Sequence, residues 1–314
     1  MRRKKFLVTG GAGFIGSHIV ERLLKEGCFV RVLDNFYSGK EKNISFASSA
    51  KNFELIRGDI RDFKTCERAC KGIDYVLHQA ALRSVPKSLD TPHEYNSINI
   101  DGILNMLKAA CEAKAARFVF ASSSSIYGET DKFPERETDL SRLISPYALT
   151  KLTGEYYCRI FSRIYGLETV SLRYFNVFGP RQALDDQYAV VIPKFISCIL
   201  NDTQPPVFGT GKQSRDFTYV EDVVRANILS AVTPGVACEV FNVANGKNQS
   251  VLGLVSLLNK ILGKNIKPLL LPKRTGDVFK TLADVSRAKK IIGFKSLFTF
   301  EEGLRKTVDW FRTH

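Results

Sequence analysis

The sequence is poor in the residues that build metal sites and disulfide frameworks. Its 314 residues include four histidines and seven cysteines, and no two cysteines form a Cys-x-x-Cys motif. No histidines stand at the spacing of zinc ligands, so the sequence predicts no metal site. An odd number of cysteines without regular spacing is typical of free thiols in a reducing compartment.

Long apolar runs are also missing. The apolar stretch near the N-terminus, Phe6-Leu7-Val8, is too short for the core of a secretory signal peptide. No segment approaches the ~18 apolar residues that a membrane-spanning helix needs. We therefore expect a soluble cytoplasmic protein with no membrane partner.

Acidic residues are outnumbered, with 32 Asp and Glu against 46 Lys and Arg and a formal net charge of +14. Apart from Arg2-Arg3-Lys4-Lys5, the basic residues are spread along the chain, and that cluster reads as a solvated lead-in to the first strand. We therefore expect no nucleic-acid partner. A positive field also favours a small anionic ligand.

The first half of the chain alternates apolar runs with amphipathic segments. The runs are "KKFLVT", "FVRVLD", "NFELIRGD", "DYVLHQAA" and "ARFVFASS", and two later ones are "LETVSLRYFNV" and "EVFNVANG". Short apolar strands that alternate with helices predict an α/β fold with a Rossmann-type, doubly wound parallel sheet. Prolines and glycines become frequent after residue 176. We expect a first domain over 1–175, to which 216–243 returns, and a smaller C-terminal α/β substrate-binding domain over 176–314.

A glycine-rich turn follows the first predicted strand. Gly10, Gly13 and Gly16 recur every three residues, and Gly11-x-Gly13-x-x-Gly16 matches the dinucleotide fingerprint between a strand and a helix. Glycine lets the backbone approach a pyrophosphate at a helix N-terminus. Asp34 ends the next strand, where a carboxylate binds the adenosine ribose and disfavours a 2′-phosphate. The pattern predicts NAD rather than NADP; the alternative is a turn that needs glycine only for packing.

"SPYALTKLTGEYY" has the start signals of a helix, with Ser145 as N-cap and Pro146 at the first helical position. Tyr147 and Lys151 then lie four residues apart on one face. A phenol with a pKa near 10 is a poor base at pH 7. A lysine ammonium and the positive nicotinamide ring would lower that pKa, and a shift of about three units needs roughly 4 kcal/mol. Downstream of a dinucleotide fold, this pair predicts a catalytic tyrosine and lysine.

Together with these features, eight motifs carry a family resemblance: "TGGAGFIG", "DNF", "GDIRD", "HQAA", "ASSSSIYG", "SPYALTK", "RYFNVFGPRQ" and "SRDFTYVEDV". Along almost its whole length, the chain resembles the NAD-dependent UDP-sugar 4-epimerases of the extended short-chain dehydrogenase/reductase superfamily. The resemblance implies that Tyr147 removes the proton of the sugar 4′-hydroxyl and later returns one. It also implies that Lys151 tunes Tyr147 and holds the nicotinamide ribose, and that Ser123 binds the sugar 4′-oxygen.

The same resemblance implies two sets of binding residues. Those implied for NAD are Gly10, Gly13, Phe14, Ile15, Gly16, Asp34, Asn35, Ser38, Gly39, Asp59, Ile60, Gln79, Ala80, Ala81, Asn99, Ser122, Tyr147, Lys151 and Tyr174. Those implied for the UDP-sugar are Ser84, Ser123, Tyr147, Asn176, Val190, Val191, Phe195, Phe208, Arg215, Arg274, Asp277 and Thr281. Asn176 corresponds to a contact with the substrate diphosphate, and Arg215, Arg274 and Asp277 to residues that grip diphosphate and ribose.

Three features bear on the substrate. Dehydratases of the superfamily carry an Asp-Glu acid pair where this chain has Ser124 and Ser125, so elimination would lack its acid. Thr281 stands where a bulky tyrosine excludes N-acetylated sugars in some relatives, so we expect both UDP-glucose/galactose and their 2-acetamido counterparts to fit. Arg83 or Lys87 could meet a carboxylate, which leaves a UDP-uronic acid 4-epimerase or decarboxylase open. A non-catalytic NAD- or RNA-binding protein of the same fold is the remaining alternative.

Two segments indicate an oligomer. The amphipathic segment "SINIDGILNMLKAACEAKA" and the helix that contains Tyr147 correspond to helices that pair across a four-helix bundle in this superfamily. The resemblance implies a homodimer, although both apolar stripes could instead face the sheet.

Overall fold

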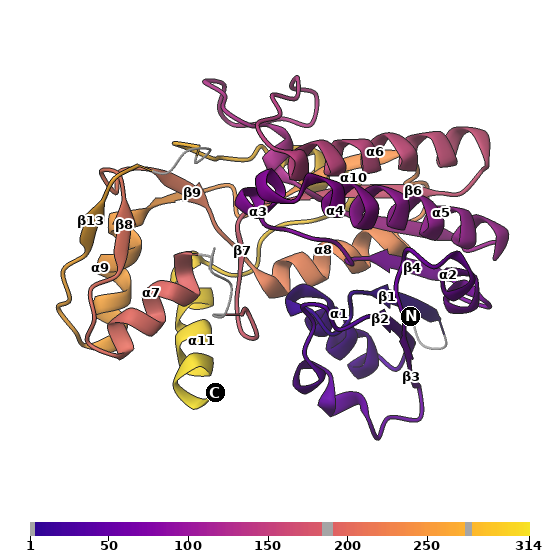
Figure 1. Ribbon diagram of the computed structural model, residues 1–314, viewed down its shortest axis with the longest axis horizontal. Coiled ribbons are helices and arrows are strands. Elements are labelled where there is room, and N and C mark those ends of the chain that lie inside the picture. Colours follow the sequence, from indigo (N-terminus) through magenta and orange to yellow (C-terminus); the bar gives the residue numbers. More distant parts are fainter. Residues whose placement is uncertain (1–3, 184–190, 274–277) are drawn as a thin grey trace.

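Seven parallel strands form the central sheet of the computed structural model, which describes residues 4–183, 191–273 and 278–314 (Figure 1). In spatial order the strands are β11 (Glu239–Val243), β6 (Thr169–Tyr174), β5 (Arg117–Ser123), β4 (Tyr75–His78), β1 (Lys5–Thr9), β2 (Phe29–Asp34) and β3 (Phe53–Arg57). The chain order reverses between β1 and β4, where an open parallel sheet forms its ligand crevice. The predicted Rossmann-type α/β fold is confirmed.

Helices cover both faces of this sheet. One face packs against α1 (Phe14–Lys25), α8 (Val220–Val232) and α10 (Ser286–Ile292), and the other against α2 (Phe63–Cys70), α5 (Gly102–Glu112) and α6 (Pro146–Ile164). Because side chains alternate along a strand, Phe6 and Val8 join the first core and Leu7 joins the second. Both faces are therefore buried, which explains why the strands read as continuous apolar runs.

Helix α6, which carries Tyr147 and Lys151, begins where the sequence predicts. Pro146 occupies the first turn, and the Ser145 hydroxyl accepts a hydrogen bond from the Ala148 amide at 3.1 Å. Ahead of α5 lie the short helices α3 (Val85–Asp90) and α4 (Pro92–Asn96). They follow the carboxyl end of β4 and pack against α6, and α3 contributes to the wall of the crevice.

A smaller lobe stands beside the sheet, on the left in Figure 1. Its apolar core joins α7 (Val191–Leu200), α9 (Val251–Leu262) and α11 (Phe300–Thr313). The described residues also form three two-stranded sheets, which pair β7 (Val177–Phe178) with β10 (Thr218–Tyr219), β8 (Pro206–Phe208) with β13 (Leu269–Leu271), and β9 (Ser214–Asp216) with β12 (Asn248–Ser250). Between β10 and β12 the chain crosses back through α8 and β11, and β11 becomes the edge strand beside β6. The precise domain limits stay a prediction.

Candidate active site

A cavity of about 1210 Å³ runs along the carboxyl ends of the parallel strands and into the smaller lobe. It exceeds the roughly 300–1,000 Å³ of an ordinary small-molecule pocket, so it has room for two ligands. Predicted cofactor residues that line it are Gly10, Gly13, Phe14, Ile15, Gly16, Asp34, Asn35, Ser38, Gly39, Asp59, Ile60, Gln79, Ala80, Ala81, Ser122, Tyr147, Lys151 and Tyr174. Predicted substrate residues that line it are Ser123, Asn176, Val191, Phe195, Phe208, Arg215 and Thr281. Val190, Arg274 and Asp277 lie outside the described residues.

The glycine turn has the geometry of a phosphate cradle. Gly10 has a φ of +65°, and a Cβ there would lie 2.8 Å from the Ala80 amide nitrogen. A Cβ on Gly16 would lie 2.2 Å from the Gly10 carbonyl oxygen, so helix and turn touch backbone to backbone. A Cβ on Gly13 would meet only the Gly10 oxygen, at 3.1 Å, and would otherwise fill the cavity. No side chain caps the start of α1, so its first N–H groups remain available to an anion.

Asp34 lies at the carboxyl end of β2 with its carboxylate held by backbone donors. Its Oδ2 accepts from the Ala12 amide at 2.9 Å and its Oδ1 from the Phe36 amide at 2.8 Å. Burial raises the pKa of Asp34, and the two backbone N–H groups counteract that rise. The carboxylate is therefore placed at the cavity edge, as expected for a group that binds ribose hydroxyls.

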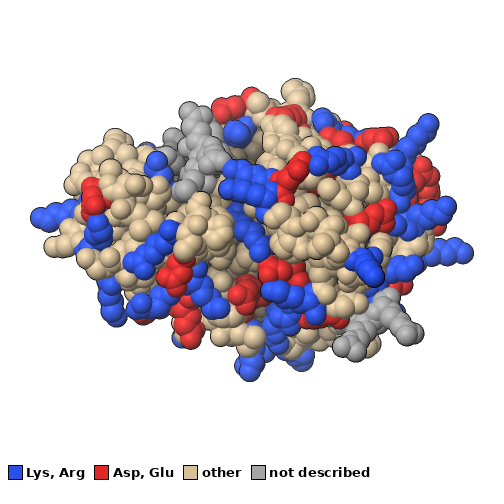
Figure 2. All heavy atoms as spheres, turned by 90° about the horizontal axis from the view of Figure 1, so that it is seen from below, with Lys and Arg blue, Asp and Glu red and all other residues tan. Residues whose placement is uncertain are grey.

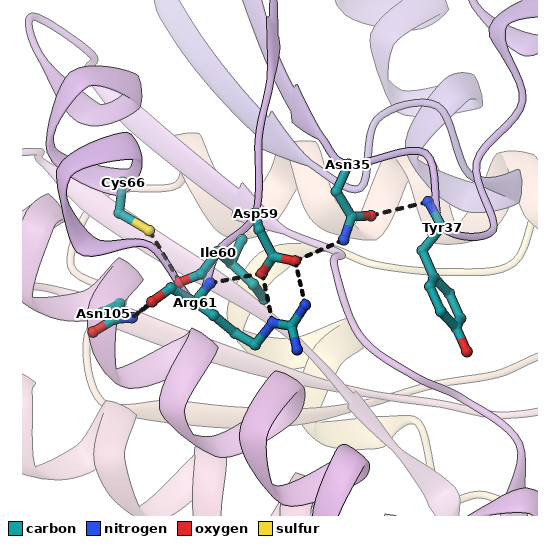
Figure 3. A network of polar contacts seen from close by, with 7 residues as sticks. All are labelled: Asn35, Tyr37, Asp59, Ile60, Arg61, Cys66 and Asn105. Carbon is teal, nitrogen blue, oxygen red and sulfur yellow. Dashed lines mark hydrogen bonds and ion pairs between the residues drawn. The ribbon is translucent and has the colours of Figure 1, made fainter.

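Asp59, after β3, anchors the next part of the wall (Figure 3). It accepts from the Arg61 Nε and Nη2 atoms at 3.0 and 2.7 Å and from Asn35 Nδ2 at 2.9 Å. The Arg61 guanidinium holds the pKa of Asp59 at about 2. The neighbouring Ile60 carbonyl accepts from Asn105 Nδ2 at 3.1 Å, so this loop is tied to α5. Arg61 and Asn105 were not predicted, because their roles depend on contacts across the fold.

A buried amide–phenol cluster supports the wall under β1, β4 and β6. The Tyr174 hydroxyl lies 3.1 Å from Gln79 Oε1 and 2.8 Å from Asn227 Nδ2, and Gln79 Nε2 donates to Asn227 Oδ1 at 3.0 Å. Asn227 belongs to α8 and is fully buried. Its hydrogen bonds hold Gln79 and Tyr174, two predicted cofactor residues, in place. No local signal in the sequence identifies Asn227.

Two predicted site residues stand behind the cavity wall rather than on it. Asn99 exchanges hydrogen bonds with the Leu82 backbone at 2.8 and 3.0 Å and donates to Thr150 Oγ1 at 3.0 Å. Ser84 caps α3, and its backbone is held by the Tyr95 hydroxyl. Both residues shape the loop after β4, whose Leu82 and Arg83 do line the cavity. The structure thus gives Asn99 and Ser84 a positioning role, and their direct contacts with a ligand stay a prediction.

Tyr147 projects from the first turn of α6 beside the end of β5, and only 9% of it is exposed. Burial raises the pKa of its phenol, whereas a hydrogen bond with Ser123 and the positive charge of Arg83 lower it. The sequence predicts Lys151 as the cation that lowers this pKa. That role of Lys151 stays a prediction, and the structure adds the positive charge of Arg83, whose influence on Tyr147 could not be read from the chain.

Lys151 lies one turn further along α6 and points beneath the phenol ring. Its Nζ donates to the Ala121 carbonyl oxygen at 2.7 Å and stands 5.9 Å from the centre of the Tyr147 ring. Burial lowers the pKa of Lys151 to about 7. The Lys151 ammonium has three donor hydrogens, and the Ala121 carbonyl accepts one of them. Lys151 also lines the cavity.

Glu155 continues the same face of α6 and was not predicted. It accepts from Ser122 Oγ at 2.5 Å and forms two hydrogen bonds with Arg173 of β6, at 2.9 and 2.8 Å. Tyr147, Lys151 and Glu155 thus recur every four residues toward the sheet. The ion pair and Ser122 together fasten α6 to the ends of β5 and β6.

The described residues that line the cavity around Tyr147 are rich in hydroxyls and include no acid. Ser122, Ser123, Ser124 and Ser125 all line it, and the Ser125 Oγ has no hydrogen-bond partner in the described parts of the chain. Among the described residues, only Asp34 and Asp59 bring carboxyl groups to the cavity, and both lie at its glycine-turn end. Within the described residues, the tyrosine end therefore presents no side-chain carboxylic acid that could protonate a leaving hydroxyl.

The smaller lobe supplies the far end of the cavity. Val191 and Phe195 of α7 and Phe208 of β8 contribute apolar walls, and Arg215 of β9 contributes a guanidinium. Arg215 Nη1 donates to the Ser214 and Phe279 carbonyls at 2.9 and 3.2 Å, which orients the side chain. Sequence reasoning missed several lining residues here, among them Lys194, Gln182, Trp310, Phe311 and His314. Trp310 is the single tryptophan of the chain, but only the fold brings it to the cavity.

Three features concern other kinds of partner: the surface charge, the side chains that could bind a metal ion, and the length and hydropathy of the helices. On the face in Figure 2, Lys and Arg side chains are scattered among Asp and Glu rather than gathered in one basic patch. No cluster of three His, Cys, Asp or Glu residues in the described segments is arranged to hold a metal ion. No helix over these segments is long and apolar enough to cross a membrane.

Comparison with known proteins identifies the family. The profile of the NAD dependent epimerase/dehydratase family matches residues 6–244. The chain belongs to this family. Its fold and glycine turn are those of the extended short-chain dehydrogenase/reductases, and the cradle at Gly13 with the fixed Asp34 carboxylate fits its cofactor, NAD.

Three relatives illustrate the range of the family. A UDP-N-acetylglucosamine 4-epimerase from Methanobrevibacter ruminantium, in complex with UDP-N-acetylmuramic acid, is 43% identical, with a TM-score of 0.95 over 100% of this chain and 99% of that one. A UDP-glucose 4-epimerase from Thermotoga maritima, with UDP-glucose, is 40% identical, with a TM-score of 0.92 over 98% of each chain. A UDP-glucuronate 4-epimerase from Thermodesulfobacterium geofontis is 35% identical over 97% of this chain and 95% of its own. Decarboxylases of UDP-uronic acids are also among the relatives. This NAD-dependent epimerase/dehydratase is therefore an enzyme of the UDP-sugar class.

Proposed function

We propose that the protein inverts C4 of a UDP-hexose or UDP-N-acetylhexosamine through a 4-keto sugar. One observation carries this proposal: a phenol hydrogen-bonded to Ser123 lines the cavity where the described chain offers hydroxyls and no carboxylic acid. Oxidation and re-reduction at C4 need a base that can also act as an acid, which a tyrosine supplies. Elimination of a hydroxyl needs a separate acid, for which Ser124 and Ser125 are unsuited.

When bound, NAD accepts a hydride from the sugar carbon and gives it back. In our proposal Tyr147 removes the proton of the C4 hydroxyl and returns one after the sugar has turned. Ser123 holds the C4 oxygen and stabilises the phenolate through its hydrogen bond. Arg83 favours the same phenolate by its charge, and Lys151 holds a ribose hydroxyl from below. The small side chains of Ser123, Ser124 and Ser125 leave room for the keto sugar to turn.

The same arrangement of residues indicates which part of the cavity would bind NAD and which part would bind the UDP-sugar. Gly13 and the start of α1 would hold the pyrophosphate of NAD, and Asp34 the adenosine ribose. Arg215 would meet the UDP diphosphate, because a guanidinium donates two parallel hydrogen bonds to phosphate oxygens. Val191, Phe195 and Phe208 would enclose the uracil. All seven cysteines are free thiols, which supports our expectation of a cytoplasmic enzyme.

Arg83 favours one second candidate, a UDP-uronic acid 4-epimerase. Its guanidinium lines the cavity close enough to affect the Tyr147 phenol, and a C6 carboxylate could meet it there. The uronate epimerase among the relatives is consistent with this alternative.

The test is a panel of UDP-hexoses, UDP-N-acetylhexosamines and UDP-uronic acids, incubated with the purified protein without added NAD. We expect chromatography to resolve 4-epimers of the first two groups, because NAD that is regenerated in each cycle stays bound. Conversion of uronic acids alone would replace the proposal by the second candidate. A 4-keto-6-deoxy product, or loss of the carboxylate as CO₂, would refute epimerisation.

We further propose that the chain forms a homodimer through α5 and α6. The apolar side chains of Leu149, Tyr156, Ile160 and Ile164 are 51%, 55%, 47% and 73% exposed. Their spacing places them along one side of α6, turned away from the sheet. An apolar stripe of this length on a surface helix is typical of a protein interface, and α5 lies directly beside it (Figure 1).

A further inference from the structure

Tyr37 stands at the mouth of the cavity, at the end where the glycine turn and Asp34 lie. It lines the cavity and yet remains 60% exposed, so it belongs to the rim and not to the floor. It follows Asp34 by three residues, and a carboxylate at that place in the fold binds the adenosine ribose of NAD. The Tyr37 ring therefore lies beside the part of the opening that the adenosine passes.

The loop that carries Tyr37 is fastened by its own polar groups. Asn35 Oδ1 accepts from the Tyr37 amide at 3.0 Å, and Asn35 Nδ2 donates to Asp59 Oδ2 at 2.9 Å (Figure 3). At the far end of the loop, the Lys40 amide donates to the Ala12 carbonyl oxygen at 3.0 Å. Figure 3 shows the Tyr37 ring extending away from this loop. The backbone is thus held, and the side chain is the part that is free to move.

The Tyr37 hydroxyl is hydrogen-bonded to the carboxylate of Glu94 on α4. The charge of Glu94 raises the pKa of the Tyr37 phenol, as expected where a hydroxyl donates to a carboxylate. Glu94 also lies close enough to Arg61 to act on it electrostatically, and Arg61 is the residue that holds Asp59. The loop after β2, the loop after β3 and α4 therefore converge at this hydrogen bond.

Helix α4 gives Glu94 a fixed position. The next residue, Tyr95, is only 1% exposed, and its hydroxyl donates to the Ser84 carbonyl oxygen at 2.7 Å and accepts from the Ser84 amide at 3.0 Å. The Tyr95 ring meets the Tyr147 ring edge-on, with 6.4 Å between the two centroids. Because Tyr95 is held between the loop after β4 and α6, the Glu94 carboxylate is presented from a rigid support.

Tyr37 and Glu94 come from opposite halves of the sheet. The chain order reverses between β1 and β4, and β2 lies on one side of this point, whereas α4 follows β4 on the other. The ligand crevice of an open parallel sheet lies between these two halves. A hydrogen bond that joins them spans the crevice, at the end of the cavity that Asp34, Asp59 and Ile60 line.

We propose that Tyr37 and Glu94 form a clasp over the adenosine end of the cavity, which slows both the entry and the release of NAD. The hydrogen bond joins two groups of the protein, so it needs no contact with the cofactor. When it breaks, the exposed Tyr37 ring can swing off the opening while Glu94 stays in place. The inference concerns the cofactor alone and holds for any UDP-sugar substrate. Slow release suits the proposed function, in which NAD is regenerated in each cycle.

The test measures how fast NAD enters and leaves, which needs no turnover. Protein loaded with radiolabelled NAD is mixed with an excess of unlabelled NAD, and the label that stays bound is followed with time. Association of the labelled NAD is followed on protein freed of cofactor. Tyr37→Phe removes the hydroxyl and keeps the ring, and Glu94→Ala removes the carboxylate. For each variant we expect both rates to rise about three- to tenfold, the effect of one hydrogen bond, with Kd within about twofold of wild type.

Matched variants and a double variant complete the design. Tyr165→Phe removes an exposed phenol hydroxyl at the end of α6, and Glu67→Ala removes an exposed carboxylate on α2. Neither residue is among the described residues that line the cavity, so both variants should keep the wild-type rates. If Tyr37 and Glu94 act as one clasp, Tyr37→Phe/Glu94→Ala should release NAD no faster than the faster of the two single variants. Melting temperature checks that each variant is folded.

Unchanged rates in both single variants would overturn the inference. A weaker Kd with an unchanged association rate in Tyr37→Phe alone would overturn it too, because the hydroxyl would then bind NAD itself. Additive effects in the double variant would show two independent contacts instead of one clasp. None of these outcomes depends on whether the enzyme inverts C4, so failure of the proposed function is seen separately, in the products formed from UDP-sugars.

Discussion

Glu155 and Arg173 form an ion pair through two hydrogen bonds of 2.9 and 2.8 Å, and each side chain is only 6% exposed. Glu155 also accepts from Ser122 Oγ, which lines the cavity. The pair joins the helix that carries Tyr147 and Lys151 to the strands that carry Ser122 and Tyr174. The placement of Tyr147 relative to the cavity wall at Ser122 therefore depends on a charge pair that does not itself line the cavity.

Glu155→Gln is expected to destabilise the protein strongly. It keeps the shape of the side chain but leaves the Arg173 guanidinium buried without its counter-charge, which costs about 3–5 kcal/mol. Urea denaturation measures the loss. Glu301→Gln is the matched control, because Glu301 pairs with Arg305 on the surface of α11, where solvent screens the charges. Equal urea midpoints for the two variants would contradict the structural role of the buried pair.

Tyr147→Phe is expected to lower kcat by about 10²–10⁴-fold, the usual contribution of a positioned acid or base. The ring and its packing against Tyr95 remain, so the bound NAD and the melting temperature should stay unchanged. Turnover of UDP-galactose, scaled to bound NAD, is the measurement. Tyr165→Phe removes an exposed hydroxyl at the end of α6 and should leave kcat at its wild-type value. Retention of activity in Tyr147→Phe would assign the proton transfer to another group.

Because His78 is buried as a neutral imidazole, we expect the protein to lose stability in acid. Burial lowers the pKa of His78 to about 3, against about 6.5 for an unfolded chain. Between those values the unfolded state binds a proton that the native state does not, so the free energy of unfolding falls as the pH falls from 6.5 toward 3. His78→Asn removes the titration and keeps an acceptor near Thr9 Oγ1, which lies 2.9 Å from Nδ1.

Urea titrations at pH 7, 6 and 5 compare the two proteins. The free energy of unfolding should fall more steeply for wild type than for His78→Asn over this range. His93→Asn, at an exposed position on α4, should follow the wild-type slope. Parallel curves for wild type and His78→Asn would show that the buried imidazole contributes nothing to acid sensitivity.

The exposed stripe on α6 predicts a dimer in solution. Sedimentation should give a species of twice the 35.2 kDa of one chain at micromolar concentration. The double variant Ile160→Glu/Ile164→Glu places two charges in the apolar stripe and should sediment as a monomer. Leu140→Glu changes an apolar residue that is 88% exposed outside α6 and should remain dimeric. A wild-type protein that sediments only at 35 kDa would refute the interface.

Much of this protein was determined by short-range signals in its sequence. Apolar runs of strand length between helical segments predicted the parallel sheet, because side chains on both faces of such strands must be buried. The glycines at 10, 13 and 16 predicted the cradle, since their spacing and their place between strand and helix are local properties. Tyr147 and Lys151 could be paired on one helix face from periodicity alone.

Tertiary structure alone decided how these parts act on one another. The charge of Arg83 acts on the Tyr147 phenol in addition to the predicted Lys151, and Asn99 supports a loop instead of lining the cavity. Glu155 meets Arg173 across 18 residues, and Thr281 meets Asn176 across 105. Such pairs have no periodicity and no spacing rule, because packing between helices, sheet and the smaller lobe sets their distances. The sequence thus determined which chemical groups are present, and the fold decided which atom of each group faces a ligand.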